Sequence, residues 1–396
     1  MKRFYAILFA LFMVNGAMAQ WVPQNSGTTK NLTSVYFTDA NTGYAVGRDF
    51  YGTEGIIIKT VNGGTTWTIL SSGVMSGFES VFFTHADTGY VVGGNGTILK
   101  TINGGATWSA LSSGTMNWLN SVCFTNSNTG FVVGGLGTIL RTINGGATWT
   151  NIPSGTNNGL SSVFFPNENI GYAVGGVAEV EGTILKTING GATWTALSNG
   201  TTYYLTSVYF TDVNTGYVVG YSPNIIKTID GGANWNILSS EGFGFGSVFF
   251  TNADTGYIVG GHIFKTVNAG TDWDYLFLDW NLKSIFFTDC DTGYVVGSEG
   301  TIYKTINGGG YPVRVNAYSS STNMMTICPN PTSANITIES FIKGHLSILN
   351  LHGQELISRQ ITESKTQLNI TDLPAGIYFV RVTGERTVEM GKFIKL

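Results

Sequence analysis

The sequence predicts an all-β protein, a seven-bladed β-propeller followed by a small C-terminal β-sandwich. The first observation is internal repetition, since one pattern of strands and turns occurs in seven copies. The second is that no stretch of ten residues after the first 19 has the periodicity of a helix. The third is composition, because 54 glycines in 396 residues and 13% aromatic residues are too many for a helical protein.

Each copy of the repeat predicts a run of strands joined by short turns. The first strand resembles "LTSVYF" at 32–37, the second "TGYAVG" at 42–47, and the third "GTILKT" at 96–101, which leads into "INGGATW". One serine marks the first strand of every copy: Ser34, Ser80, Ser121, Ser162, Ser207, Ser247 and Ser284. One glycine marks the following turn: Gly43, Gly89, Gly130, Gly171, Gly216, Gly256 and Gly293. The serines are 37 to 46 residues apart, which is the length of a four-stranded propeller blade.

Tryptophans indicate where the fourth strands begin and how the ring closes. Six copies carry one: Trp67, Trp108, Trp149, Trp194, Trp235 and Trp273. The seventh copy ends at "INGGG" (306–310) without a tryptophan, but "WVPQNSGTTKNLTSV" (21–35) aligns without a gap on "WTILSSGVMSGFESV" (67–81). We therefore expect residues 21–24 to complete the last blade, which removes open sheet edges. Residues 311–315 are the alternative, with Pro312 where tryptophan is expected.

The segment "TINGGATW" fits the spacing S/T-x-D/N-x-G-x-x-W and resembles the Asp-box of the bacterial neuraminidase repeat. An Asx side chain can accept hydrogen bonds from the backbone of a tight turn, and glycine permits a positive φ. The resemblance implies a structural turn that lies away from any active face.

The full blade, "LxSVxFTxxxTGYxVGxxGTIxKTxNGGxTW", resembles the propeller of photosystem II stability and assembly factors over residues 21–310. The resemblance implies the fold, whereas related propellers serve as scaffolds, sialidases, glucanases and receptor ectodomains.

The first 19 residues resemble a secretory signal peptide. Lys2 and Arg3 precede an apolar stretch from Phe4 to Val14, and Ala17-Met18-Ala19 provides small residues for cleavage. The apolar stretch is too short to span a bilayer, and we expect no transmembrane segment after its removal. The formal net charge of −4, without a basic stripe, argues against nucleic acid as a partner.

The C-terminal part predicts a separate domain. We expect the propeller over 20–315, a polar linker over 316–325 and a β-sandwich over 326–396. Three features in order resemble the sorting domain of type IX secretion substrates: "PNP" at Pro329, Asn330 and Pro331; "LPAGIYFVRV", with Leu373, Pro374, Gly376 and Tyr378; and "GKFIKL", with Gly391, Lys392 and Lys395. The resemblance implies the type IX secretion machinery as a partner. It also implies passage through the periplasm of a Gram-negative bacterium to the medium or the outer cell surface.

Blade topology predicts two different faces. The first-to-second turns and the Asp-boxes share one face, here called the turn face. The second-to-third loops and the blade connections share the other, here called the loop face. Binding groups belong on irregular loops held by a rigid scaffold, so we expect ligand contacts on the loop face. The candidates are Phe50, Tyr51, Trp118, Tyr203, Tyr204, Phe243, Asp279 and Trp280; Phe245 is a further aromatic of these connections.

Catalytic and metal signals are weak. A sialidase needs three arginines grouped around the substrate carboxylate. The arginines of the propeller region lie at unrelated positions, since Arg141 stands at a repeat position otherwise held by lysine and Arg314 follows the last box. We therefore expect no arginine triad. Glu54 and Glu299 could form a glycosidase acid pair, because blades one and seven are neighbours. The "DANTG" motif at 39–43 lacks the downstream acid of a calcium loop. We expect no catalytic residue, no metal and no cofactor.

Two further residue sets are interpreted as structural. One cation recurs in each blade, which could bind an acidic partner or cover the blade with its stem: Lys59, Lys100, Arg141, Lys186, Lys227, Lys265 and Lys304. Cys123, Cys290 and Cys328 have no close spacing, which favours inert thiols over a disulfide or a metal site.

The sequence thus favours a secreted or surface propeller that binds a protein or a glycan without catalysis. The alternative is an extracellular glycoside hydrolase of the Asp-box propeller type.

Overall fold

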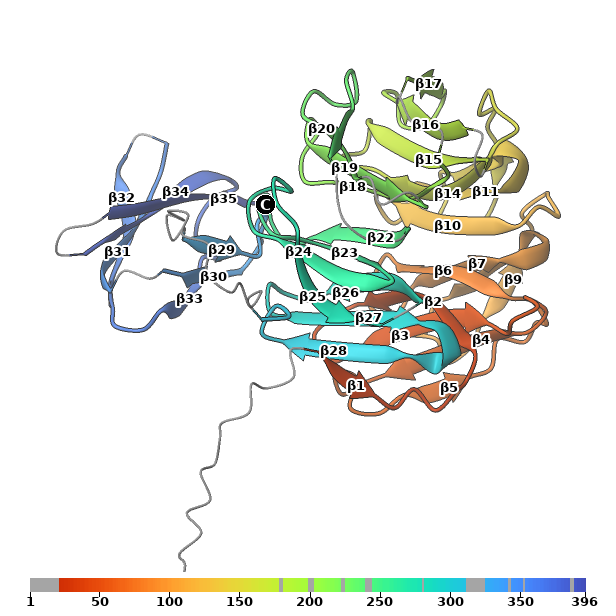
Figure 1. Ribbon diagram of the computed structural model, residues 1–396, viewed down its shortest axis with the longest axis horizontal. Coiled ribbons are helices and arrows are strands. Elements are labelled where there is room, and N and C mark those ends of the chain that lie inside the picture. The colour runs from red at the N-terminus through yellow and green to blue at the C-terminus, as the bar shows by residue number, and fades with distance from the viewer. Residues whose placement is uncertain are drawn as a thin grey trace, which may run out of the picture.

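A computed structural model gives the fold of the chain (Figure 1). It describes residues 21–177, 181–198, 203–221, 225–238, 244–279, 281–310, 325–340, 343–351, 353–384 and 388–396. The predicted signal peptide, most of the predicted linker, Phe243 and Trp280 lie outside the described residues.

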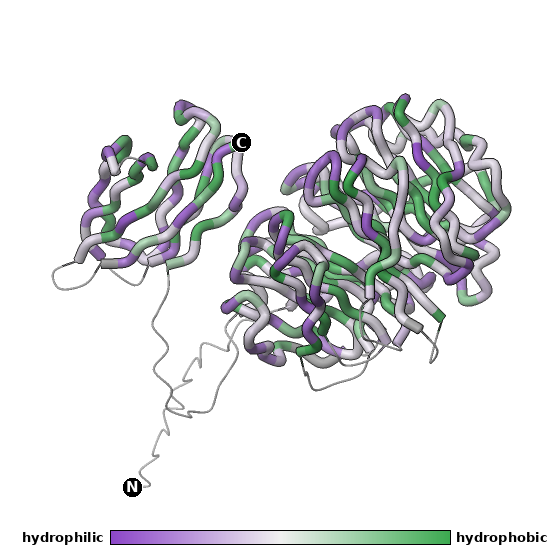
Figure 2. Tube along the Cα trace, turned by 90° about the horizontal axis from the view of Figure 1, so that it is seen from above, coloured by the Kyte–Doolittle hydropathy of each residue, from purple (hydrophilic) through white to green (hydrophobic). Residues whose placement is uncertain are grey.

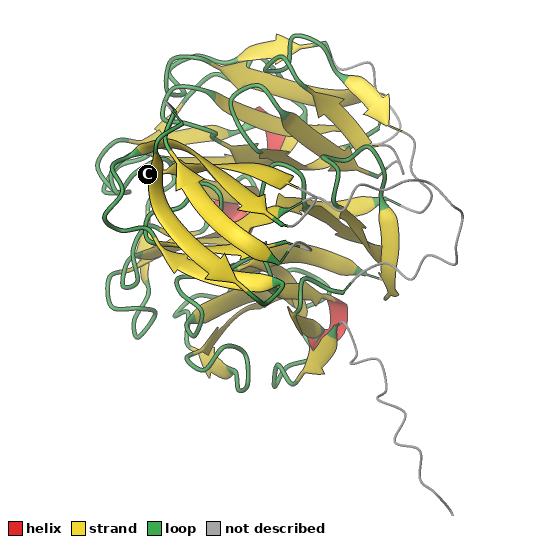
Figure 3. Ribbon diagram, turned by 90° about the vertical axis from the view of Figure 1, so that its left-hand side faces the viewer, coloured by secondary structure: helices red, strands yellow, loops and turns green. Residues whose placement is uncertain are grey.

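Seven four-stranded antiparallel sheets form the propeller within the described residues, and strands make up nearly all of its regular structure (Figures 1 and 3). The innermost strands of blades one to seven are β2 (Asn31–Phe37), β6 (Phe78–Phe83), β10 (Leu119–Phe124), β14 (Gly159–Phe164), β18 (Leu205–Phe210), β22 (Phe245–Phe250) and β26 (Leu282–Phe287). The second strands are β3 (Gly43–Arg48), β7 (Gly89–Gly93), β11 (Gly130–Gly134), β15 (Gly171–Val177), β19 (Gly216–Gly220), β23 (Gly256–Gly260) and β27 (Thr292–Gly297). The third strands are β4 (Gly55–Thr60), β8 (Ile98–Thr101), β12 (Ile139–Thr142), β16 (Glu181–Thr187), β20 (Ile225–Thr228), β24 (His262–Thr266) and β28 (Ile302–Ile306).

The outer strands are short and complete each blade. In blades one to six they are β5 (Thr68–Leu70), β9 (Ser109–Leu111), β13 (Thr150–Asn151), β17 (Thr195–Leu197), β21 (Asn236–Leu238) and β25 (Asp274–Leu278). Three-residue 3₁₀ turns connect the second and third strands of blades two, three and seven: η1 (Gly94–Gly96), η2 (Gly135–Gly137) and η3 (Ser298–Gly300).

The ring closes as the tryptophan alignment predicts. β1 (Val22–Gln24) pairs antiparallel with β28, with Val22 opposite Lys304 and Gln24 opposite Ile302. Trp21 is only 2% exposed and meets Phe287 edge to face at 6.1 Å. The first strand described in the chain is therefore the outer strand of the last blade.

Aromatic residues fill the space between neighbouring blades, which explains why the strands are apolar on both faces. Phe37 of blade one stacks on Tyr294 of blade seven at 3.9 Å, and Trp67 meets Phe37 edge to face at 6.0 Å. The same trio recurs at the next junction with Tyr44, Phe83 and Trp108. Aromatic pairs add to the large free energy of burying such rings.

The repeated serine joins the innermost strands of adjacent blades. Ser34 Oγ accepts a hydrogen bond from the backbone N–H of Val81 in blade two at 3.3 Å. Ser284 Oγ does the same for Val35 at 3.4 Å, so blades seven and one are joined like the others. The serine is thus a junction residue rather than a candidate nucleophile.

The repeated lysine also joins blades, so its ammonium group is not simply solvated. Lys59 Nζ and the hydroxyl of Tyr44 both donate to the carbonyl of Gly104, in the next blade, at 2.7 and 2.8 Å. Equivalent pairs occur, among the described residues, in blades two, four, five, six and seven: Tyr90 and Lys100, Tyr172 and Lys186, Tyr217 and Lys227, Tyr257 and Lys265, Tyr294 and Lys304. The cations are therefore junction groups, which argues against a ring that binds an acidic partner.

The repeated decapeptide forms a tight turn that the preceding blade uses. Asn103 Oδ1 accepts from the Thr101 hydroxyl at 3.0 Å and from the Thr107 N–H at 2.9 Å. Gly104 and Gly105 have φ values of +63° and +82°, which glycine adopts without strain. This turn presents the Gly104 carbonyl to blade one, so repetition of the decapeptide reflects repetition of the junction.

The C-terminal unit is a small two-sheet domain beside the propeller (Figures 1 and 2). One sheet has the order β29-β30-β33 and the other β32-β31-β34-β35. The strands are β29 (Thr326–Cys328), β30 (Asn335–Glu339), β31 (Gly344–Leu349), β32 (Glu355–Ile361), β33 (Lys365–Asn369), β34 (Gly376–Thr383) and β35 (Val388–Lys395). Alternating residues from both sheets form one apolar core, as a sandwich requires.

Candidate functional site

Every innermost strand begins with a β-bulge, which directs the bulged residue toward the loop face. In blade two the register passes from Phe78 to Ser80, so Glu79 has no partner on β7. Every other blade has the same shift, and the bulged residues are Thr33, Glu79, Asn120, Ser161, Thr206, Gly246 and Lys283. The side chains of Thr33, Asn120 and Thr206 bond to backbone carbonyls of a neighbouring blade. Glu79 and Lys283 are the charged members of the set.

Glu79 organises a buried polar group with two loop-face residues. Its Oε1 accepts from Arg48 Nε at 2.5 Å and from Trp118 Nε1 at 3.1 Å. Burial raises the pKa of Glu79, although Arg48 and Trp118 act in the opposite direction. Among the described residues, none accepts a hydrogen bond from the two terminal nitrogens of Arg48, whose side chain is 31% exposed. Arg48 therefore keeps donors available on the loop face.

Trp118 supports this group rather than offering an open ring face. The Arg48 guanidinium lies 5.5 Å from the centre of the indole. Gly52 and Gly94 pack so closely against the indole that a Cβ on either would lie 2.5 or 3.0 Å from ring carbons. Trp118 thus links the loops of blades one and two, and it is a positioning residue with little free surface for stacking.

The loop after β3 presents two exposed aromatic side chains beside this group. Phe50 and Tyr51 are 82% and 83% exposed, and their rings meet edge to face at 5.4 Å. Asp49 fixes the loop, because its Oδ1 accepts from the N–H groups of Thr53 and Glu54 at 2.7 and 3.0 Å. These hydrogen bonds, led by that from Glu54, lower the pKa of Asp49. Exposed aromatic rings on a fixed loop are suited to contact with a partner.

A second aromatic group lies at blades four and five. The Ser161 hydroxyl donates to the Tyr204 hydroxyl at 2.6 Å, and the Tyr204 ring lies 5.2 Å from that of Tyr221. Tyr221 is 66% exposed and Tyr203 44%. Burial of its hydroxyl raises the pKa of Tyr221, with smaller contributions from Tyr204 and Glu79. The charge of Lys283 makes a small contribution that lowers the pKa of Glu79, and Glu79 in turn makes a small contribution that raises the pKa of Tyr221.

The remaining candidates divide into three cases. The first case is Asp279, whose Oδ2 accepts a hydrogen bond from the Tyr303 hydroxyl at 2.6 Å. Burial together with this bond raises the pKa of Tyr303 to about 12. Phe245 is wrong as a surface candidate, because it is 2% exposed and occupies the core position that Phe78 holds in blade two and leucine holds in the other five blades. Phe243 and Trp280 lie outside the described residues.

Glu54 and Glu299, the possible acid pair of a glycoside hydrolase, make hydrogen bonds with other residues. Glu54 Oε2 accepts from Lys30 Nζ at 2.9 Å, and the Glu299 backbone N–H donates to Asn31 Oδ1 at 3.1 Å. The "DANTG" motif forms an Asx turn, since Asp39 Oδ1 accepts from the N–H groups of Asn41 and Thr42 at 2.8 and 2.9 Å.

The three sorting motifs, separate in sequence, meet in the C-terminal unit. Asn330 Oδ1 accepts from the Ile394 N–H at 2.8 Å, and its amide donates to the Lys392 carbonyl at 2.9 Å. The Tyr378 hydroxyl donates to the Pro374 carbonyl at 2.7 Å, and its ring stacks on Phe393 at 5.4 Å. The first motif therefore packs on the last strand.

Sequence reasoning missed Glu79, Tyr221 and Lys283. Glu79 and Lys283 occupy the position before the repeated serine, where the other blades carry Thr, Asn, Ser, Thr and Gly. Charged residues at a repeat position that is otherwise uncharged could have indicated the site from sequence alone. Tyr221 stands directly after a second strand, at the start of a second-to-third loop, and was not considered.

Comparisons with known proteins agree with this geometry. Residues 66–203 and 197–309 match the family described as photosynthesis system II assembly factor YCF48, and residues 326–396 match the secretion system C-terminal sorting domain. No curated protein matches the chain. In the described residues, no helix is long and apolar enough to cross a membrane.

Solved structures share the propeller fold. A structure titled "YCF48 bound to D1 peptide" has a TM-score of 0.61 at 20% identity, covering 73% of this chain and 97% of that one. YCF48 from Cyanidioschyzon merolae has a TM-score of 0.59 at 21% identity, covering 72% and 98%. A structure titled "Structure of U3-55K" has a TM-score of 0.59 at 9% identity, covering 73% and 99%. The chain belongs to the YCF48 family of photosystem II assembly factors and ends in a type IX sorting domain.

Proposed function

We propose that the propeller is a non-catalytic module that binds an extended segment of a partner protein on its loop face, outside the cell. The observation that carries the proposal is the pairing of Arg48, which retains hydrogen-bond donors, with the exposed rings of Phe50 and Tyr51. A peptide offers carbonyl or carboxylate oxygens to an arginine and apolar side chains to aromatic rings.

Two further considerations favour a peptide over a glycan. Among the residues predicted to stack on a sugar, Trp118 is packed against Arg48, Gly52 and Gly94 and leaves little of its indole open. A family member of the same fold is titled as bound to a peptide, which supports this class of ligand here. Phe50, Tyr51 and Tyr221 provide the exposed aromatic surface on either side of the mouth.

The C-terminal unit supports the proposed location. A sorting domain implies use of the type IX secretion machinery and delivery to the outer surface or the medium. We propose that the protein is released or anchored there, with the propeller facing the surroundings.

Peptides selected from a displayed library on the purified protein provide the probe for binding. Tyr51→Ala and Trp118→Ala are each expected to weaken the affinity at least about fivefold, which corresponds to roughly 1 kcal/mol at an interface anchor. The first removes an exposed contact, and the second releases Arg48 from its position. Isothermal titration calorimetry with one selected peptide measures both.

Ile102→Ala is the matched control, because Ile102 is 71% exposed but lies beside the Asp-box turn on the turn face. Asn103→Ala should lower stability without changing affinity, since its side chain bonds only within its own turn. Loss of affinity with Ile102→Ala, while Tyr51→Ala and Trp118→Ala bind normally, would place the site on the turn face. A screen that yields glycans and no peptides would reject the proposed class of ligand.

Truncation after Asn323 is expected to abolish appearance in the medium or at the surface, while leaving a folded propeller in the periplasm. The region that matches the sorting domain begins at residue 326, whereas the last strand of the ring ends at Ile306. The truncation therefore removes the whole sorting domain and no strand of the ring. Cell fractionation with immunodetection measures the location, and circular dichroism of the retained protein tests its folding. Export of the truncated chain at the full-length level would contradict this role.

A further inference from the structure

Two cysteines from different units of the chain face each other. Cys290 belongs to the turn between β26 and β27 in blade seven, and Cys328 ends β29, the first strand of the C-terminal unit. Each thiol shifts the pKa of the other, so the two lie close together, and both residues line one cavity of ≈ 560 Å³ at the junction of the units. Cys328 is 2% exposed, whereas Cys290 is intermediate in exposure.

Other contacts hold the two units in this arrangement. Lys365 of β33 forms ion pairs with Asp291 of blade seven and with Glu339 of β30. Pro329, Pro331 and Thr332 from the C-terminal unit line the same cavity as Thr292 and Ile306 of blade seven. The thiols therefore meet at an established contact between the units.

We propose that Cys290 and Cys328 form a disulfide in the periplasm, which links the sorting domain covalently to blade seven. Disulfides form and persist in the periplasm and at the cell surface, where the sorting domain directs the chain. The proposal is independent of what the loop face binds.

The surroundings of the pair suit thiol–disulfide exchange. The hydrogen bond from Cys328 lowers the pKa of Cys290, and the charge of Lys365 assists. The same bond and burial raise the pKa of Cys328. Cys290 is the more exposed of the two thiols and is therefore the one that an external disulfide reaches first. Cys123, in contrast, lies in β10 of blade three, and burial of its thiol raises its pKa to about 12.

The oxidant is a disulfide donor, either an oxidoreductase or, in the test, glutathione disulfide. The Cys290 thiolate attacks one glutathione sulfur, forms a mixed disulfide and releases one glutathione thiolate. Cys328 then loses its proton and attacks the Cys290 sulfur, which releases the second glutathione. Two protein thiols are oxidised to one disulfide, and one glutathione disulfide is reduced to two thiols.

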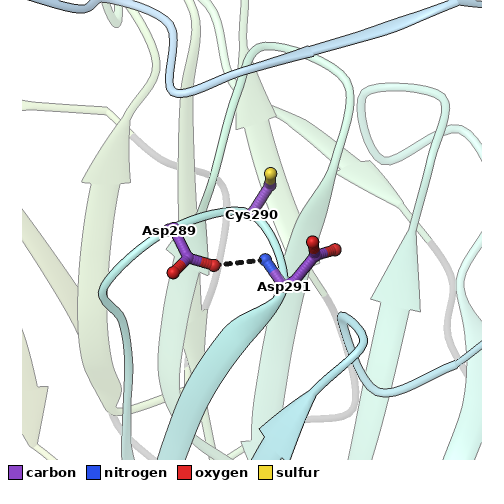
Figure 4. A group of neighbouring side chains, drawn as sticks. All are labelled: Asp289, Cys290 and Asp291. Atoms are coloured by element: carbon purple, nitrogen blue, oxygen red, sulfur yellow. Dashed lines mark hydrogen bonds between the residues drawn. The ribbon is translucent and has the colours of Figure 1, made fainter. Parts of the chain in front are cut away.

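A metal site is the other chemistry that these residues suggest. The ligand atoms of Asp289, Cys290 and Asp291 lie within 4.8 Å of one another. Asp289 Oδ1 is already bonded to the N–H groups of Asp291 and Thr292 at 2.8 and 2.7 Å, and Asp291 is paired with Lys365. Figure 4 shows the three side chains on this turn and the hydrogen bond that already engages the Asp289 carboxylate. The thiol is therefore better placed for Cys328 than for a shared ion.

The test counts thiols in the full chain after incubation with glutathione disulfide. Maleimide labelling of the unfolded, unreduced protein is expected to fall from three reactive thiols to one, that of Cys123. Cys290→Ser and Cys328→Ser should each restore reactivity of the remaining partner, and Cys123→Ser should leave none. Full reactivity of all three thiols after oxidation would overturn the proposal.

A second measurement tests where the link lies. With a site-specific protease sequence inserted between residues 320 and 321, the cut fragments should migrate as one species without reductant and as two with it. Separation without reductant would show that no link joins the units. Incubation with ZnCl₂ in place of glutathione provides the metal arm. Thiols that are protected by zinc in the folded state, but fail to form the link with glutathione disulfide, would overturn the disulfide in favour of a metal site.

Discussion

Deletion of residues 20–25 is expected to lower the melting temperature of the propeller by on the order of 10 °C. The deletion removes β1 and with it Trp21, which is 2% exposed and packs on Phe287. Truncating a buried tryptophan costs about 3–5 kcal/mol, and a domain of this size loses about 2–4 °C per kcal/mol. It also leaves β28 as an open edge that can pair with another chain. Differential scanning calorimetry and light scattering measure the two effects.

Trp108→Ala is the matched control, because Trp108 occupies the same position at an internal junction. Its effect should be smaller than that of the deletion, since β9 keeps its pairing with β8. A melting curve of the deletion variant that matches the full-length protein would contradict closure through β1.

Alkaline pH is expected to unfold the propeller cooperatively, beginning above about pH 10. Six tyrosines at blade junctions are fully buried: Tyr44, Tyr90, Tyr172, Tyr217, Tyr257 and Tyr294. Burial raises the pKa of each, to about 12 for Tyr44, Tyr90, Tyr172 and Tyr294. Each hydroxyl donates to a carbonyl of the neighbouring blade, and a phenolate cannot donate.

The sign follows from the raised pKa values. The unfolded tyrosine loses its proton near pH 10 and the folded one only near pH 12, so the stabilisation is complete below pH 10 and is lost as the pH rises through 12. Each group contributes up to about 1.4 kcal/mol per pH unit in this window. Lys265 has the opposite effect on the unfolding free energy. Burial lowers its pKa to about 8, so the folded state favours the neutral amine and gains stability as the pH rises from about 8 to 10.5. Six tyrosines outweigh this lysine.

Urea unfolding at a series of pH values, together with tyrosinate absorbance, measures the effect. Tyr90→Phe is the matched variant, because blade three already carries Phe131 at this position. It should reduce the dependence of the unfolding free energy on pH above 10. An unfolding free energy that stays constant from pH 9 to pH 12 would contradict this account.

The propeller could be predicted from sequence because its junctions repeat. Trp21 aligns with Trp67, and this alignment predicts the closing strand that pairs with β28 in the structure. The role of Lys59 was less accessible, because a lysine at a strand end looks like an ordinary solvated cation. Only the fold reveals that the Gly104 carbonyl of the next blade lies 2.7 Å from its ammonium group.

The candidate site was predicted only in part, since sequence indicates which residues break a repeat but not where they point. Trp118 broke the repeat and lies on the loop face, but as a support beneath Arg48 rather than as an exposed platform. Glu79 was missed because a bulge, and not a loop, directs it toward the mouth.

The proximity of Cys290 and Cys328 could not be read from the sequence for a different reason. Their separation spans the boundary between two folding units, and no local pattern records how such units dock. The disulfide framework of a small domain has regular spacing, whereas a single link between units does not.

Closure through β1 has a consequence for the order of events during export. Val22 pairs with Lys304, so the strand of the ring that comes earliest in the chain must wait for nearly the whole propeller before it finds its partner. This pairing has a very long sequence separation, and such contacts form late and slowly because a long loop must close first. Each apolar cluster is shared by two blades, so a partly translocated chain also lacks one wall of its last cluster. A chain that emerges amino-terminus first therefore remains an open arc until blade seven has emerged. The ring can therefore close only shortly before the sorting domain emerges, because that domain follows blade seven in the chain.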